Sequence, residues 1–158
     1  KIKKSKKMTQ SNEKNMATYI HLSTLSQYII PFGNYIFPII IWSSKKNESQ
    51  FIDENGKNAI NFQLSIFLYT MITIIIAVPL FIYGIIKNVS LTTINEGGDF
   101  IANHLSAGNI SGIVILAIIT VLLFCFLKII EFILIIYASV KSSNGEAYKY
   151  PLTINFIK

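Results

Sequence analysis

Two long uncharged apolar runs dominate the pattern of this chain. Residues 66–86 form a run of about twenty residues, which is the length a helix needs to cross a bilayer, and residues 110–127 form a second run. The longer apolar elements that contain these runs predict spanning helices over residues 59–87 and 110–140. The pattern therefore predicts an all-α integral membrane protein built on a long two-helix transmembrane hairpin.

An earlier apolar stretch, residues 19–42, is interrupted in its middle. Proline removes a backbone donor and blocks the preceding helical turn, so this stretch cannot form one straight helix. We expect a broken or re-entrant helical element, either a kinked span or two short helices. The residues predicted to form its structural turn are Pro31, Gly33, Asn34 and Pro38.

The remaining segments are polar. Residues 1–17 are rich in lysine and lack hydrophobic periodicity, which predicts a flexible basic tail ahead of a single helical membrane domain over residues 18–158. Residues 43–58 and 88–109 are predicted loops. Residues 141–158 are a predicted polar tail, with a helix stop at Asn144-Gly145.

Composition supports a membrane protein and gives it an orientation. Hydrophobic residues make up 52% of the chain and charged residues 14%, against about 25% charged in globular domains. The net charge is +6, and every cationic residue except the two histidines is lysine. These lysines flank the apolar segments, which indicates contact with anionic lipid headgroups rather than nucleic acid.

The lysine distribution also bears on topology. Residues 43–58 and 141–158 are lysine-rich, whereas residues 88–109 carry Glu96 and Asp99 and no lysine. By the positive-inside rule, both ends of the long hairpin and both termini are expected in the cytoplasm. A re-entrant hairpin over residues 19–42 would place all basic segments on one side, so we favour it over a kinked span.

Polar residues recur along the first spanning helix. At a spacing of four residues they share one helix face, and Gln63 lies at a similar depth. The stripe consists of Asn61, Gln63, Ser65, Tyr69 and Thr73. We favour helix packing as its role, because small and hydroxyl residues allow close approach in lipid; the alternative is a polar lining for a groove or pore.

Two ionisable residues interrupt the second spanning helix. Lys128 and Glu131 are three residues apart, so their side chains can pair on one helix face. We expect an intramembrane or interfacial charge pair that neutralises itself, and the alternative is a proton or ion relay.

The sequence contains no recognisable catalytic motif. His21 and His104 lack partners at metal-ligand spacing, and no phosphate loop, dinucleotide fingerprint or nucleophile elbow is present. We therefore expect no enzymatic activity, no cofactor and no bound metal.

Several short segments resemble a known family. They are His21-Leu22-Ser23, Ile30-Pro31-Phe32-Gly33-Asn34, Pro38-Ile39-Ile40-Ile41-Trp42, Ile60-Asn61-Phe62-Gln63 and Tyr148-Lys149-Tyr150-Pro151-Leu152. In this order they resemble a bacterial family of small multi-pass membrane proteins catalogued as a domain of unknown function. That family is distantly similar to the twenty-kilodalton membrane subunit of the chloroplast inner-envelope (Tic) protein translocon.

The resemblance implies a bacterial cytoplasmic (inner) membrane protein. Together with the small size and the apolar helix surfaces, it favours a non-enzymatic accessory subunit that docks onto a larger membrane complex. Protein-export machinery is the complex that the resemblance implies. The expected partners are the lipid bilayer and other membrane proteins. The alternative is a small channel or transporter formed by self-association.

Overall fold

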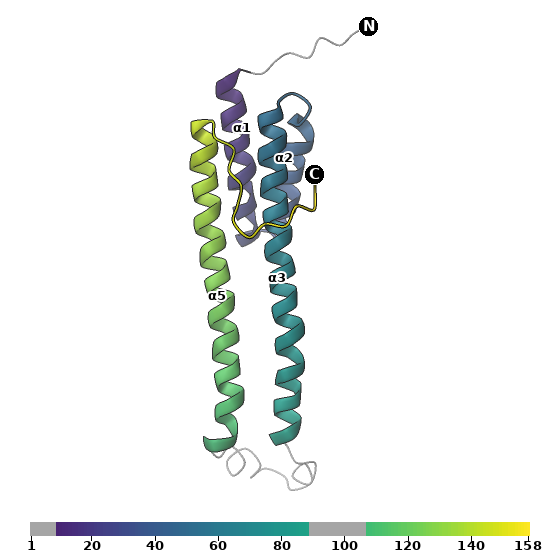
Figure 1. Ribbon diagram of the computed structural model, residues 1–158, viewed down its shortest axis with the longest axis vertical. Helices are drawn as coiled ribbons and strands as arrows, with labels where there is room; N and C mark the ends of the chain where they lie inside the picture. The colour runs from purple at the N-terminus through teal and green to yellow at the C-terminus, as the bar shows by residue number, and fades with distance from the viewer. Residues whose placement is uncertain (1–8, 89–106) are drawn as a thin grey trace. The chain divides into compact units, whose positions relative to one another are not determined.

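The computed structural model describes residues 9–88 and 107–158, and every regular element in these ranges is a helix. The helices are α1 (Gln10–Ser23), the short 3-10 helix η1 (Thr24–Tyr28), α2 (Gly33–Lys45), α3 (Gln50–Asn88) and α5 (Ala107–Asn144) (Figure 1). The predicted all-α fold is confirmed.

Two of these helices are long and apolar enough to cross a membrane. Within the described ranges they are Gln50–Gly84 of α3 and Val114–Asn144 of α5. Only 11% of the residues in the most apolar window of each helix are buried, so most of those side chains face outward. Outward-facing apolar side chains are what a helix in lipid requires.

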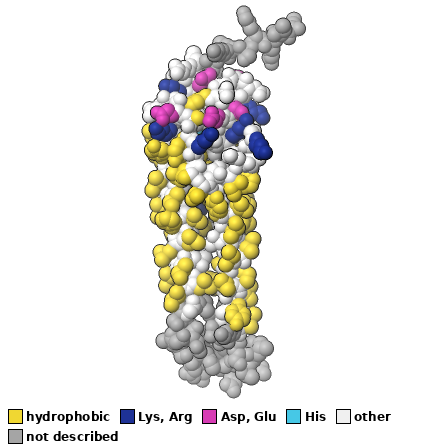
Figure 2. All heavy atoms as spheres, in the orientation of Figure 1, with side chains coloured by type: hydrophobic (Ala, Val, Ile, Leu, Met, Phe, Trp, Pro, Cys, Tyr) yellow, Lys and Arg dark blue, Asp and Glu magenta, His cyan; other side chains and the backbone are white. Residues whose placement is uncertain are grey.

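The chain divides into two compact units. Unit 1 comprises Lys1–Leu68 and Lys128–Lys158, and unit 2 comprises Tyr69–Leu127. Unit 1 contains α1, η1, α2, the first part of α3, the last part of α5 and the C-terminal segment. Unit 2 contains the remaining parts of the two long helices. Figure 2 shows that the Lys, Asp and Glu side chains on the visible face lie over unit 1.

The N-terminal part of unit 1 is a broken helical element, as the sequence predicts. α1 and α2 lie side by side (Figure 1) and are separated by η1 and a turn, in which Phe32 adopts a left-handed conformation with φ of 60°. A Cβ on Gly33 would lie 2.6 Å from the Ser26 hydroxyl oxygen and 2.9 Å from the Ser26 carbonyl carbon. Only glycine therefore lets the turn approach η1 this closely.

Two predicted boundaries are wrong. The tail expected over residues 1–17 is shorter, because α1 begins at Gln10 and buries Ala17 and Ile20 within unit 1. Residues 1–8 lie outside the described ranges. The loop expected over residues 43–58 ends at Gln50, where α3 begins, because an Asp53–Lys57 ion pair one turn apart supports a helix there.

The predicted helix stop at the end of α5 is confirmed. Gly145 has φ of +90°, a conformation that glycine adopts without strain. Its N–H donates to Ser142 O at 3.0 Å, and the N–H of Glu146 donates to Lys141 O at 3.0 Å. These two bonds form a Schellman motif, which satisfies carbonyls at the end of the helix. The predicted loop over residues 88–109 lies mostly outside the described ranges, and α5 begins at Ala107.

The predicted polar tail over residues 141–158 begins later, because α5 continues to Asn144, and the segment after it packs against the helices. It runs back along α3, where the Tyr150 ring stacks on Phe62 with centroids 4.1 Å apart and an interplanar angle of 6°. Asn58 Nδ2 donates to Tyr148 O at 3.0 Å, and the N–H of Ile154 donates to Ser65 Oγ at 2.9 Å. Polar residues of α3 therefore hold this segment in place.

Candidate functional site

A buried polar network joins four segments of unit 1. His21 comes from α1, Asn55 from α3, Ser142 from α5 and Tyr150 from the C-terminal segment. Asn55 Oδ1 lies 3.0 Å from His21 Nε2 and 2.8 Å from Ser142 Oγ, and Tyr150 OH lies 2.8 Å from His21 Nδ1. His21, Asn55 and Ser142 are fully buried, and Tyr150 is 5% exposed.

Every hydrogen bond of the network can form with His21 neutral. Asn55 Nδ2 already donates to Phe51 O at 2.8 Å, so Asn55 Oδ1 accepts from both His21 Nε2–H and Ser142 Oγ–H. His21 Nδ1 then accepts from the Tyr150 hydroxyl. Because both ring nitrogens are engaged, His21 acts here as a neutral structural connector.

Burial shifts the ionisation of this network toward its neutral form. Loss of solvent lowers the pKa of His21 from 6.5 to about 4, with a partial opposing effect from the Asn55 hydrogen bond. Burial also raises the pKa of Tyr150 well above 10, so its hydroxyl stays a donor.

We expect acidification to weaken the folded state through His21. His21 binds a proton near pH 6.5 in the unfolded chain but only near pH 4 in the folded chain. The contribution of neutral His21 to the free energy of unfolding is therefore complete above pH 6.5 and is lost as the pH falls toward 4. Between pH 7 and pH 5, the free energy of unfolding should fall by about 2 kcal/mol. This fall can be measured by unfolding the protein in mild detergent at several pH values. His21→Gln should flatten this part of the profile, and an equally steep profile in that variant would contradict the assignment.

The predicted charge pair is present and has a third member. Lys128 Nζ lies 2.8 Å from Glu131 Oε2, and Gln27 Nε2 donates to Glu131 Oε1 at 2.9 Å. Glu131 is fully buried, whereas the Lys128 side chain is 31% exposed. The pair thus joins η1 to α5 and keeps one carboxylate neutralised away from solvent.

Of the predicted turn residues, Asn34 contacts the first long helix. Asn34 Nδ2 donates to Gln63 Oε1 at 2.7 Å, and Tyr35 OH donates to Gln63 O at 3.1 Å. Gln63 Nε2 is buried and has no hydrogen-bond partner among the described residues. Pro31 is exposed in the turn, as predicted, but the assignment of Pro38 to the turn is wrong, because Pro38 is buried inside α2.

The polar stripe does not form one surface. Asn61 and Ser65 bind the C-terminal segment in unit 1: Asn61 Oδ1 accepts from the N–H groups of Phe156 and Ile157, at 3.1 and 2.8 Å. Tyr69 and Thr73 belong to unit 2, where Thr73 Oγ1 donates to Tyr69 O at 2.9 Å. The first half of the stripe thus secures a segment of the chain, and Thr73 bonds to its own helix.

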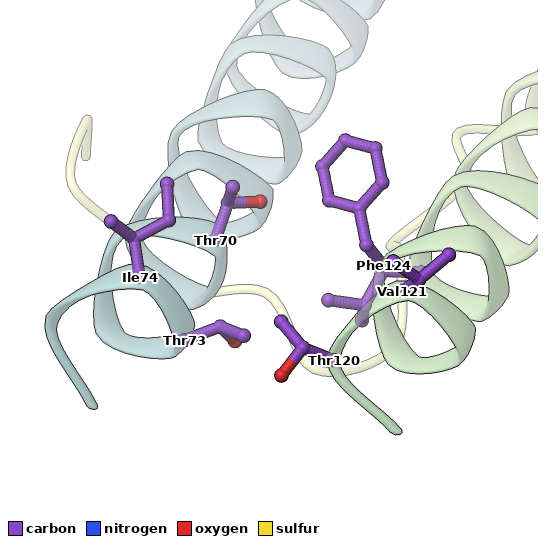
Figure 3. Close-up of a pocket in the computed structure, with 7 residues that line it drawn as sticks. Thr70, Thr73, Ile74, Thr120, Val121 and Phe124 are labelled. Carbon is purple, nitrogen blue, oxygen red and sulfur yellow. The ribbon is translucent and has the colours of Figure 1, made fainter. Parts of the chain in front are cut away.

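Unit 2 has a small pocket between its two helices. Its volume is about 210 Å³, and Thr73 and Thr120 approach each other across it (Figure 3). Both hydroxyls donate to carbonyls of their own helices, Thr73 to Tyr69 and Thr120 to Leu116. Thr70 also lines the pocket, and the remaining side chains, such as Ile74, Val121 and Phe124, are apolar. The pocket is therefore suited to an apolar occupant.

The network around His21 was not predicted from the sequence. Its pairs are 34 and 129 residues apart, so no local spacing reveals them. The available signals were His21 within a mostly apolar stretch and the aromatic pattern of residues 148–150. Among the described residues, no three His, Cys, Asp or Glu side chains are grouped to hold a metal ion.

The fold is that of a small all-helical protein with two helices long and apolar enough to span a bilayer. The chain belongs to the family described as the magnetosome magnetite crystal formation protein family, whose model matches residues 12–157. This confirms the expected membership in a family of small bacterial membrane proteins, but the match does not support the similarity to the translocon subunit. No curated protein and no solved structure matches the chain.

Proposed function

We propose that this chain is a non-enzymatic accessory subunit of a membrane assembly, and that the assembly serves the process in the family description, the formation of magnetite crystals in magnetosomes. The observation that carries the proposal is the outward-facing apolar surface of α3 and α5, only 11% buried in each spanning window. Such a surface is stable only against lipid or against other membrane proteins.

A second observation supports docking by unit 1. Beyond Glu131, α5 continues with exposed apolar side chains, and Ile133 is 57% and Tyr137 48% exposed. On their helix, Ser142 bonds to Asn55, and His21 of α1 links Asn55 to Tyr150 of the C-terminal segment. We expect these bonds to hold the face in place, which would lower the entropic cost of binding a partner.

The proposed membrane is the bacterial cytoplasmic membrane or a compartment derived from it, with both termini in the cytoplasm. The basic segments support that orientation. We further propose that the α1–α2 hairpin dips into the bilayer. Its turn supports this, because Ile29 is 84% and Phe32 70% exposed, and such side chains favour lipid over water.

Co-purification tests the accessory role. The tagged protein is extracted in mild detergent from its own host, and bound proteins are identified by mass spectrometry. We expect a membrane partner whose recovery is lost in Ile133→Ser and kept in the matched variant Ile119→Ser, which alters an equally exposed residue in unit 2. Recovery of the protein alone would refute the proposal. Recovery with export proteins would favour the translocation role that the sequence resemblance implies.

A channel or transporter is the second candidate, and buried Glu131 is the observation that favours it. A neutralised carboxylate within an apolar helix can mark an ion path. In proteoliposomes, this candidate requires a proton or cation flux that Glu131→Gln abolishes. The accessory role predicts no flux above that of empty vesicles for either protein.

A further inference from the structure

A basic groove lies on the surface of unit 1. It consists of two adjoining hollows of about 230 and 380 Å³, which share Lys57, Ile157 and Lys158. The smaller hollow is completed by residues that include Glu54 and Lys149, and the larger one by residues that include Trp42 and Lys46. Sites of a few hundred Å³ are large enough to hold a small ligand or a headgroup.

The groove is built by packing of the C-terminal segment onto α3. Asn61 accepts from the N–H groups of Phe156 and Ile157 and donates to Ile157 O at 2.9 Å. Asn58 holds the carbonyl of Tyr148. These contacts bring Lys149 and Lys158 to the same groove as Lys57, which is far from both in the sequence.

The groove has a positive net charge. The four lysines named above and the carboxylates of Asp53 and Glu54 line the two hollows, so their side chains sum to a charge of +2. Asp53 is paired with Lys57 at 2.6 Å and also accepts from Trp42 Nε1 at 2.9 Å, so its charge is compensated locally. Lys149 and Lys158 are exposed, and both are available to an anion.

The groove also adjoins apolar surface. Trp42 forms one wall, with Lys46 Nζ 4.7 Å from its ring centroid. Tryptophan favours the boundary between membrane and water. On the same helix, Ile36 and Ile40 are 47% and 59% exposed, which leaves apolar surface for acyl chains.

We propose that this groove binds the phosphate-bearing headgroup of an anionic phospholipid, with Lys149 and Lys158 as its principal cationic contacts. Basic pockets beside membrane helices bind such headgroups by electrostatic attraction. The lysines bind the phosphate, and Trp42 contacts the apolar part next to the headgroup. Free inorganic phosphate offers the same charge but none of the apolar contact, so the lipid is the expected ligand. This site is independent of the proposed accessory role.

Lipid binding to the full chain tests the site. The purified protein in detergent is titrated with phosphatidylglycerol or phosphatidylcholine, and bound lipid is counted by native mass spectrometry. The intact protein should retain phosphatidylglycerol preferentially. The double variant Lys149→Gln/Lys158→Gln should weaken that binding by roughly tenfold or more, since each lysine near an anionic surface contributes appreciably. Removing a carboxylate in Glu54→Gln should strengthen the binding.

A second double variant, which removes two lysines outside the groove, tests whether lipid binding depends on the groove or only on the total charge of the protein. Lys45 and Lys141 pair with Glu48 and Glu146 at 2.9 and 2.6 Å, and neither lines the hollows. The double variant Lys45→Gln/Lys141→Gln should keep the lipid preference. Equal loss in both double variants, or equal binding of the two lipids by the intact protein, would overturn the proposal. Displacement of bound lipid by millimolar inorganic phosphate would also overturn it, because a free anion would then be the ligand.

Discussion

Replacing Gly56 by alanine should destabilise the protein by about 2 kcal/mol. Helix propensity alone predicts the opposite sign, a gain of about 1 kcal/mol. However, Gly56 is buried in α3 directly against Trp42, and an added Cβ would overlap the Cδ1 and Cγ atoms of the indole. Trp42 cannot rotate away without losing its bond to Asp53. Overpacking of this kind costs about 1–3 kcal/mol in addition to the broken hydrogen bond.

Gly112 provides the matched control. It lies in α5, and a Cβ added there would meet nothing within 4 Å. Gly112→Ala should therefore show the propensity gain, about 0.5–1 kcal/mol. Both variants can be followed in mild detergent by the fluorescence of Trp42, the only tryptophan in the sequence. A stabilised Gly56→Ala protein would show that α2 and α3 do not pack as described.

Replacing Asn55 by leucine should cost about 3–4 kcal/mol. Leucine is similar in size, but it removes the acceptor for two buried donors, His21 Nε2–H and Ser142 Oγ–H. Each buried donor left without a partner costs about 1–3 kcal/mol. The measurement is the free energy of unfolding in detergent. Asn47→Leu, at an exposed position, should change it by less than about 0.5 kcal/mol.

A double-mutant cycle makes the test specific. Tyr150→Phe removes the hydroxyl that His21 Nδ1 accepts from. Because Asn55 and Tyr150 act on opposite sides of one imidazole, their effects should be coupled by about 1 kcal/mol. Strictly additive effects would indicate that the four segments are not joined through His21.

The long helices could be predicted from the sequence because a bilayer imposes a simple requirement. Residues 66–86 and 110–127 contain no charge, and only a spanning helix satisfies that many backbone groups in lipid. The turn near Gly33 and the stop at Gly145 were equally predictable, because proline and glycine act locally on the backbone. The Lys128–Glu131 pair was found because both residues lie on one helix, three positions apart.

The start of α3 could not be predicted because residues 50–58 have the composition of a loop. Asn55 and Gly56 disfavour helix in isolation, yet tertiary packing buries both. The partners of Asn55 come from α1 and α5, and the partner of Gly56 is the indole of α2. Contacts between such distant segments cannot be inferred from one sequence, and the network around His21 was missed for the same reason.

Depth-dependent accessibility tests the central claim that α3 and α5 lie in a bilayer. Spin labels are placed at residues 75 and 119, which are 67% and 57% exposed, and at residue 43 in unit 1, with Cys125→Ser as the background. In lipid vesicles, the labels at 75 and 119 should be relaxed by oxygen and protected from a water-soluble nickel complex. The label at 43 should show the reverse. Strong relaxation by nickel at 75 and 119 would contradict the claim.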